Sequence, residues 1–243
     1  MNRWMSVAFA GLALLLARPA AAQLQGLPVY FSPKGGSGIT FAGDFGRVSS
    51  TKVNGVSSPA HPTTIGGRVS LGLPFVTVGV GAAVYDPKIS TLDNELQYAG
   101  TAALKVFGGP LVPLAISLQA GVGYLKQGSG AFAQKNVNVP IGVGAALNVP
   151  TPGASLEPWL AARGQLRSTS VGAASGTQFG VGLSGGLSVG LPIGLGLHVA
   201  ADWSRYSAKT SGALTLDKVE QLVIGIGAHY SIRLPGVPMV PGI

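Results

Sequence analysis

The chain has 243 residues, with 16 lysines and arginines against 8 aspartates and glutamates, and no cysteine. A charged fraction of only 10% beside a hydrophobic fraction of 47%, at a formal charge of +8, excludes an intrinsically disordered chain. The lack of cysteine excludes disulfides, thiolate metal sites and cysteine nucleophiles.

The N-terminus has the order of a secretory signal peptide. A positive charge at Arg3 precedes the apolar run MSVAFAGLALLLA, and the small residues of ARPAAAQ follow. We expect residues 1–22 to be removed by cleavage between Ala22 and Gln23, because the run is shorter than the ~20 residues of a membrane span. An uncleaved anchor is the alternative. Loss of Arg3 and Arg18 lowers the formal charge from +8 to +6 (8 minus 2).

Residues 23–37, which begin QLQGLPVYFSPKGG, precede the first regular segment. They show no alternation of apolar and polar residues. We expect them to form a leader on the periplasmic side of a membrane, and a leader that reaches into the interior of the protein is the alternative.

Alternation with a period of two dominates the rest of the chain. In VTVGVGAAVY (76–85) the even positions are apolar, whereas the odd positions are small until Tyr85. Each such segment has about the 9–11 residues of a tilted transmembrane strand, or slightly more, and no mature run of 18 apolar residues indicates a helical span. Ten segments are predicted as strands: 38–48, 64–73, 76–85, 96–107, 114–126, 136–148, 157–167, 178–191, 195–206 and 219–234.

The connections alternate between long and short, as in outer-membrane barrels. The long ones are expected outside the cell: 49–63, 86–95, 127–135, 168–177 and 207–218. The sequence therefore predicts an all-β fold, a closed antiparallel transmembrane β-barrel over 38–234 with a Pro/Gly-rich tail at 235–243. Eight or twelve strands are alternatives to ten. A soluble sandwich or lipocalin-like barrel is a further alternative, but its outer face would carry charges.

Aromatic side chains fall on the predicted outer face near the ends of the segments. Such positions are typical of the aromatic girdles at the two membrane interfaces. The predicted girdle comprises Phe45, Tyr98, Tyr124, Phe179 and Trp203 near the long loops, with Phe75 and Tyr230 near the short turns.

The last segment, QLVIGIGAHYSIRL, resembles the C-terminal assembly signal of outer-membrane barrels, and Gly227, Tyr230 and Ile232 fit its spacing. The chain then continues with PGVPMVPGI, whereas that signal normally ends a chain with an aromatic residue. By pattern, the mature chain resembles the outer-membrane β-barrel superfamily, including small OmpA-, OmpX- and OmpW-like barrels. The resemblance implies the fold and the outer membrane of a Gram-negative-type bacterium, and it names no substrate.

Polar side chains on the predicted inner face form a lumen polar cluster. Such groups fill and rigidify a small barrel through hydrogen bonds and ion pairs, and a narrow pore or ligand site is the alternative. Antiparallel pairing across the loop after Val48 sets residues near 44 directly opposite residues near 68, which predicts an ion pair between Asp44 and Arg68. The cluster comprises Asp44, Arg68, Gln97, Lys105, Glu157, Arg163, His198, Asp202, His229 and Arg233.

The predicted function is that of an integral outer-membrane protein with a largely plugged lumen and a structural or surface-interaction role. A narrow passive channel for small solutes is the alternative, and an outer-membrane enzyme acting on lipid comes third. His229 and Ser231 have the His-x-Ser spacing of lipid A deacylases of this architecture. No acidic residue is close in sequence, so we expect no catalytic residue and no enzyme activity. The histidines are far apart in sequence, so no metal or cofactor is expected.

Cations gather in or beside the predicted long loops, where anionic lipid headgroups are their natural partners. Solvation of the loops is the alternative. We expect the lipid bilayer as partner, no nucleic acid, and a monomer in preference to an oligomer. The cations are Lys52, Lys88, Lys126, Lys135, Arg167, Arg205, Lys209 and Lys218.

Overall fold

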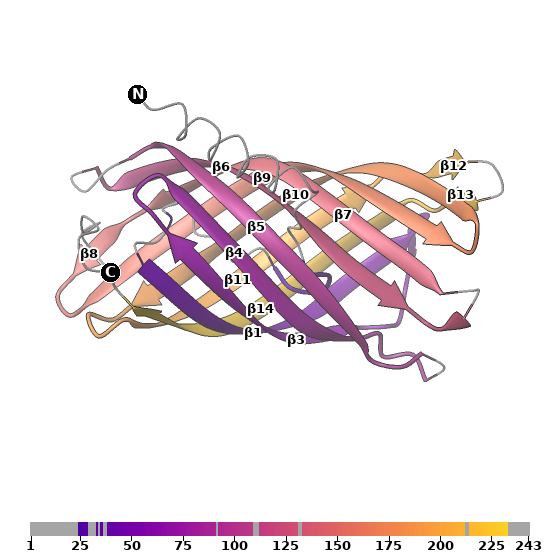
Figure 1. Cartoon of the computed structure of the whole chain (residues 1–243), viewed down its shortest axis with the longest axis horizontal. Helices are drawn as coiled ribbons and strands as arrows, with labels where there is room; N and C mark the ends of the chain where they lie inside the picture. The colour runs from indigo at the N-terminus through magenta and orange to yellow at the C-terminus, as the bar shows by residue number, and fades with distance from the viewer. Residues whose placement is uncertain are drawn as a thin grey trace, which may run out of the picture.

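Ten long antiparallel strands close into a barrel in the computed structural model (Figure 1). The structure describes residues 24–28, 33, 35, 38–90, 92–108, 112–130, 133–211 and 214–232. Within these ranges, no helix has the length and apolar character needed to cross a bilayer. The strands of the wall are β1 (Gly38–Val53), β3 (Thr63–Gly72), β4 (Val76–Asp86), β5 (Glu95–Phe107), β6 (Leu114–Gln127), β7 (Gln134–Leu147), β9 (Ala154–Val171), β10 (Ala174–Gly190), β11 (Leu195–Tyr206) and β14 (Val219–Ile232).

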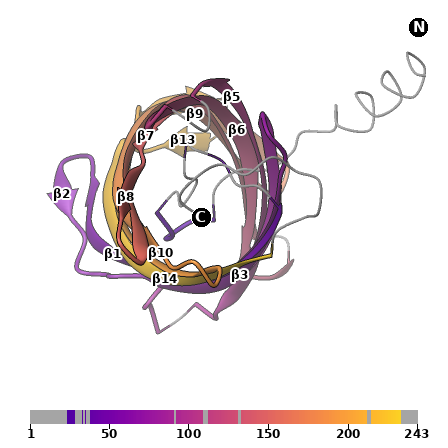
Figure 2. The ribbon, with the colours of Figure 1, turned by 90° about the vertical axis from the view of Figure 1, so that its left-hand side faces the viewer.

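The sheet closes because β1 pairs with β14 as well as with β3. Ile39 faces Ile232 in the first ladder and Leu71 in the second. Each of the remaining wall strands pairs with the wall strand before it and the wall strand after it in the chain. The wall therefore has no free edge, as the view along the barrel axis shows (Figure 2). Closure lets each wall strand pair its backbone on both sides, which lipid requires. The predicted count of ten strands is confirmed.

The period of two separates an apolar outer wall from an inner face. On β4, Val80 is 67% exposed, whereas Ala83 is buried. The same alternation leaves large aliphatic side chains exposed around the barrel, such as Ile65, Ile141 and Leu197. A soluble protein would bury or avoid so large an apolar surface. The outer wall of this barrel is therefore suited to contact with the hydrocarbon of a bilayer. The soluble alternatives are thereby excluded.

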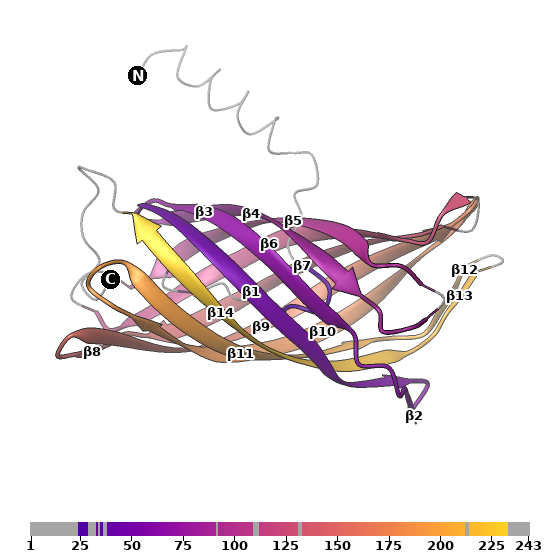
Figure 3. The ribbon, with the colours of Figure 1, turned by 90° about the horizontal axis from the view of Figure 1, so that it is seen from below.

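Four short strands lie outside the ten-stranded wall, at its two ends (Figure 3). At the long-loop end, where the longer connections gather, β2 (Val56–Ser57) folds back on β1, and β12 (Lys209–Ser211) pairs with β13 (Leu214–Leu216). At the short-turn end, β8 (Val149–Thr151) pairs with the start of β9. That the long-loop end faces the cell exterior stays a prediction.

The prediction of a long loop at residues 168–177 is wrong. Residues 168–177 were expected to be irregular, but the ladder between β9 and β10 continues to Val171 opposite Ala174. Only a tight turn at Gly172, with φ of +57°, reverses the chain. Polar residues extend the strands here because they bond across the sheet, as Thr169 Oγ1 does to Asn136 Oδ1 at 2.8 Å.

Candidate functional site

The predicted leader enters the barrel. Gln25 N donates to Gln97 Oε1 at 2.7 Å, and Gln97 Nε2 donates back to Gln25 O at 2.8 Å. Thr64 Oγ1 adds a third bond to Gln25 O at 2.9 Å. Both wall residues are buried near the long-loop ends of β3 and β5. The expectation of a leader outside the barrel is therefore wrong for residues 24–28, which lie within the ring of strands in Figure 2.

Apolar contacts hold the same segment in place. Leu24 and Leu27 are buried in one cluster with Ala83, against which Ala99 packs. A Cβ on Gly46 of β1 would collide with the carbonyl oxygen of Gly26. The wall is thus bare at this level because a segment of main chain occupies the space that side chains would fill.

Nearer the short-turn end, Pro33 is fully buried. A Cβ on Gly144 of β7 would meet the Pro33 ring at 2.6 Å, and one on Gly35 would meet Thr77 Oγ1 at 3.0 Å. Thr77 and Gly144 lie close to the short-turn ends of their strands. The described parts of the leader therefore follow the lumen from its long-loop half to the start of β1.

The predicted ion pair between Asp44 and Arg68 is present. Arg68 Nε lies 2.9 Å from Asp44 Oδ2, and His198 Nε2 lies 2.7 Å from Asp44 Oδ1. The register differs from the expectation, because Asp44 faces Gly66, and Arg68 faces Ala42. The pair is therefore diagonal, which the long arginine side chain can span.

A glycine makes room for this cluster. Gly227 faces Asp44 in one ladder and His198 in the next, so it separates them on the inner wall. A Cβ on Gly227 would collide with both side chains. The His198 ring also stacks on the His229 ring, with centroids 5.6 Å apart and the planes inclined at 21°.

A second ion pair is more completely buried than the first. Arg163 Nη2 on β9 is 2.5 Å from Asp202 Oδ2 on β11, and Arg163 Nη1 donates to Ser184 Oγ at 3.3 Å. Both charged side chains are at least 95% buried. Because a buried charge needs a partner, the two clusters link β1, β3, β9 and β11 across the lumen.

The other members of the predicted lumen polar cluster also face inward. Gln97 and Glu157 are buried, and Lys105 is half-buried. Arg233 lies outside the described residues, as do the cleavage site at Ala22 and Gln23 and the tail at 235–243.

The predicted girdle residues lie on the outer wall. Exposed fractions range from 36% for Tyr124 to 56% for Phe179 among Phe45, Tyr98, Tyr124, Phe179 and Tyr230. Trp203 is half-buried, and its Nε1 donates to Glu220 Oε1 at 3.2 Å. That these side chains form an aromatic girdle at the membrane interfaces stays a prediction.

The sequence analysis missed several large inward side chains. Tyr85, Trp159 and Tyr206 are buried in the lumen. Arg167, which was counted with the loop cations, lies on β9 with its guanidinium carbon 3.6 Å from the centre of the Tyr206 ring. Position parity could have identified Trp159, Tyr206 and Arg167, because each shares a strand face with a predicted lumen residue, and Tyr85 lies on the face of 76–85 that carries the small residues.

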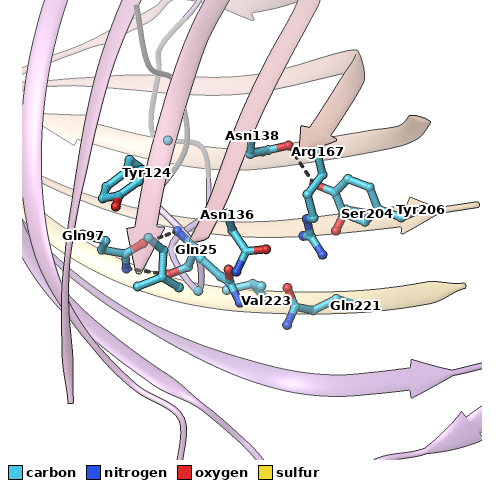
Figure 4. A pocket seen from close by; sticks show the side chains of 13 residues that line it. Gln25, Gln97, Tyr124, Asn136, Asn138, Arg167, Ser204, Tyr206, Gln221 and Val223 are labelled. Atoms are coloured by element: carbon cyan, nitrogen blue, oxygen red, sulfur yellow. Dashed lines mark hydrogen bonds between the residues drawn. The ribbon is translucent and has the colours of Figure 1, made fainter. Parts of the chain in front are cut away.

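Arg167 and Tyr206 line a pocket on the long-loop side of the leader (Figure 4). Gln25 and Gln97 contribute to one part of its lining, and Asn136, Asn138 and Arg167 to another. The pocket is polar and carries one cationic side chain in its lining.

The His-x-Ser spacing does not assemble a catalytic triad in the described residues. Ser231 Oγ shares a hydrogen bond of 2.8 Å with Thr40 Oγ1, and His229 Nδ1 lies 3.3 Å from His198 Nδ1. The nearby carboxylate, Asp44, contacts His198.

No family model and no curated protein matches the chain. Among solved structures, the beta domain of the Bordetella autotransporter BrkA is similar, with a TM-score of 0.54 and 11% identity over 81% of this chain and 100% of that chain. The outer membrane protease OmpT of Escherichia coli gives a TM-score of 0.45 and 10% identity over 80% and 97% of the two chains. Neisserial surface protein A gives a TM-score of 0.37 and 13% identity over 81% of this chain and 98% of that chain.

At such identities the likeness concerns the fold. The likeness to the BrkA beta domain agrees with the closed antiparallel wall, which the structure shows by itself. The chain is a closed, ten-stranded, antiparallel transmembrane β-barrel, similar in fold to the BrkA beta domain.

Proposed function

We propose that this protein is a structural or surface-interacting outer-membrane barrel whose lumen is closed by its own N-terminal segment. The observation that carries the proposal is the docking of residues 24–28 inside the lumen, where three hydrogen bonds join Gln25 to Thr64 of β3 and Gln97 of β5. Main chain inside a narrow barrel obstructs the passage of solutes more completely than side chains alone.

The ion-pair clusters support the same function. Asp44, Arg68 and His198 come from three strands, β1, β3 and β11, and the pair of Arg163 and Asp202 joins β9 to β11. Their mutual contacts hold the charges in fixed positions, whereas a conducting pore needs groups that exchange partners with solvent and ions. A narrow passive channel is the second candidate, because half-buried Lys105 and Arg68 would line a lumen from which the leader had withdrawn.

Conductance in planar bilayers tests the proposal. The full mature protein is expected to give no steady ion current, whereas a variant lacking residues 24–35 should conduct, because the segment between Thr64, Gln97 and Gly46 is then missing. Gly46→Val should conduct as well, since its side chain competes with the Gly26 carbonyl for the same space.

Gly43→Val is the matched control. It lies on the same strand, but a Cβ there meets nothing within 4 Å. It should behave like the natural protein. A steady current through the full protein would favour the passive channel, and a silent deletion variant would show that the side-chain clusters close the lumen without the leader.

An enzymatic role stays third, because Ser231 and Asp44 have other partners in the described residues. Ser231 bonds Thr40 instead of a histidine there, and Asp44 contacts His198 instead of His229, so these residues do not form the serine–histidine pair that a nucleophilic site requires.

We also propose anionic lipid headgroups as partners of the outer wall. Lys126 and Lys135 face each other across β6 and β7, and both are exposed at the long-loop end, beside outward-facing Tyr124. Like charges directly opposite repel, and a bound phosphate would relieve the repulsion.

The double variant Lys126→Gln, Lys135→Gln should therefore retain less anionic lipid during purification than the natural protein. Quantifying bound phospholipid by mass spectrometry measures this. The single variant Lys209→Gln is the control, because Lys209 faces Leu216 across the β12–β13 hairpin and therefore has no second cation opposite it to share a phosphate. Equal lipid retention in all three proteins would reject the site.

A further inference from the structure

Arg167 is the cation in the pocket on the long-loop side of the leader. No carboxylate among the described residues holds its side chain in place. Its guanidinium stacks on the Tyr206 ring, and the Tyr206 hydroxyl donates to Asn138 Oδ1 at 3.0 Å. Within the described residues, the guanidinium makes no hydrogen bond or ion pair that would occupy its N–H groups. The side chain is thus fixed by stacking while its donors remain available, as Figure 4 shows for its position among the pocket residues.

The neighbouring amides add donors rather than acceptors. Asn136 Oδ1 already accepts from Thr169 Oγ1 at 2.8 Å and from Gln134 Nε2 at 3.2 Å, and Asn138 Oδ1 accepts from Tyr206. Each amide nitrogen carries two N–H groups and has one long contact of 3.5 Å within the described residues. A spare N–H therefore remains on each asparagine.

The geometry brings these donors together. Asn138 faces Arg167 directly in the ladder between β7 and β9, and Asn136 is two positions along the same inner face. No carboxylate lines this pocket among the described residues. Asp44 and Asp202 are engaged in the two ion-pair clusters, and Glu220 bonds the Trp203 indole. The pocket thus combines positive charge with N–H donors.

We propose that Arg167, Asn136 and Asn138 form a binding site for a small oxyanion, the carboxylate or phosphate of a free solute that enters from the long-loop end. A planar guanidinium can offer two parallel N–H donors to such a group. The backbone and side chain of Gln25 with Gln97 close the inner side of the pocket, so the site holds a ligand rather than passing it through. The site is independent of whether the lumen conducts.

Titration with inorganic phosphate tests the site. The protein, refolded in a maltoside detergent that carries no phosphate, is labelled with ¹⁵N and observed by NMR at constant ionic strength. Phosphate should produce saturable shifts of the Arg167 Nε–H resonance and of the Asn136 and Asn138 amide resonances. Sodium chloride at the same ionic strength should not, because chloride cannot bridge the guanidinium and the amides.

Two variants examine the assignment independently. Arg167→Gln should weaken phosphate binding by at least about tenfold, since a charge-assisted pair of bonds is lost. Asn138→Asp keeps the acceptor for Tyr206 and places a carboxylate opposite Arg167, so it should abolish binding while the arginine remains. Arg205→Gln, an exposed outward cation on β11, is the control and should bind phosphate as the natural protein does.

The proposal is overturned if phosphate causes no saturable shift in the natural protein, or if the affinity of Asn138→Asp equals that of Arg205→Gln. Shifts that appear only at Lys126 and Lys135 would place the anion on the outer wall and would reject the pocket.

Discussion

Asp44→Asn is expected to lower the free energy of unfolding by about 3–5 kcal/mol, the cost of breaking a buried ion pair by removing one partner. The Asp44 side chain is 1% exposed and contacts both Arg68 and His198. The amide keeps the volume of the carboxylate but leaves the arginine charge without its counter-charge. Urea unfolding of the barrel in lipid vesicles measures the loss.

A double-mutant cycle separates the pair from its surroundings. With Arg68→Gln as the second change, the two losses should be clearly smaller together than the sum of the single losses. The solvent-accessible pair of Lys88 and Asp86, in which Lys88 Nζ lies 2.6 Å from Asp86 Oδ2, provides the control. Its cycle should show no measurable coupling, because water and salt screen it. Additive losses at Asp44 and Arg68 would show that their contact contributes nothing to stability.

Val80→Arg is expected to cost about 2–4 kcal/mol in the same vesicles, since it places a charge near the bilayer midplane. Val80 lies in the middle of β4 and is 67% exposed on the outer wall. Val80→Leu is the control at the same position and should be close to neutral, because lipid accepts the larger aliphatic side chain. If arginine is tolerated as well as leucine, this face of β4 does not contact hydrocarbon.

Local pattern alone determined most of the wall. In the segment 76–85 each residue's face depends only on whether its number is odd or even, because successive side chains on a strand point to opposite sides. That rule correctly placed Val80 outside and Gln97 inside, and the alternating connections gave ten strands. It also brought Asp44 and Arg68 to one face of neighbouring strands, close enough for their ion pair.

Strand ends depended on contacts that sequence pattern does not encode. Residues 168–177 look like a loop because they are polar and small, yet Thr169 pairs with Asn136 across the sheet. A polar residue can extend a strand wherever its neighbour supplies a hydrogen bond, and only the register identifies that neighbour.

The tertiary structure alone decided what fills the lumen. The leader has no periodicity, and Gln25 reaches a partner 72 residues away, Gln97. His198 is 154 residues from Asp44 and meets it only because β14 lies between β11 and β1 in the closed wall. Arg167 reads as a loop cation until β9 is seen to continue past it. For the residues on strands, the face follows from the alternation of side chains along the strand. Their partners are set by closure of the barrel, which brings distant strands and the leader together around one narrow interior.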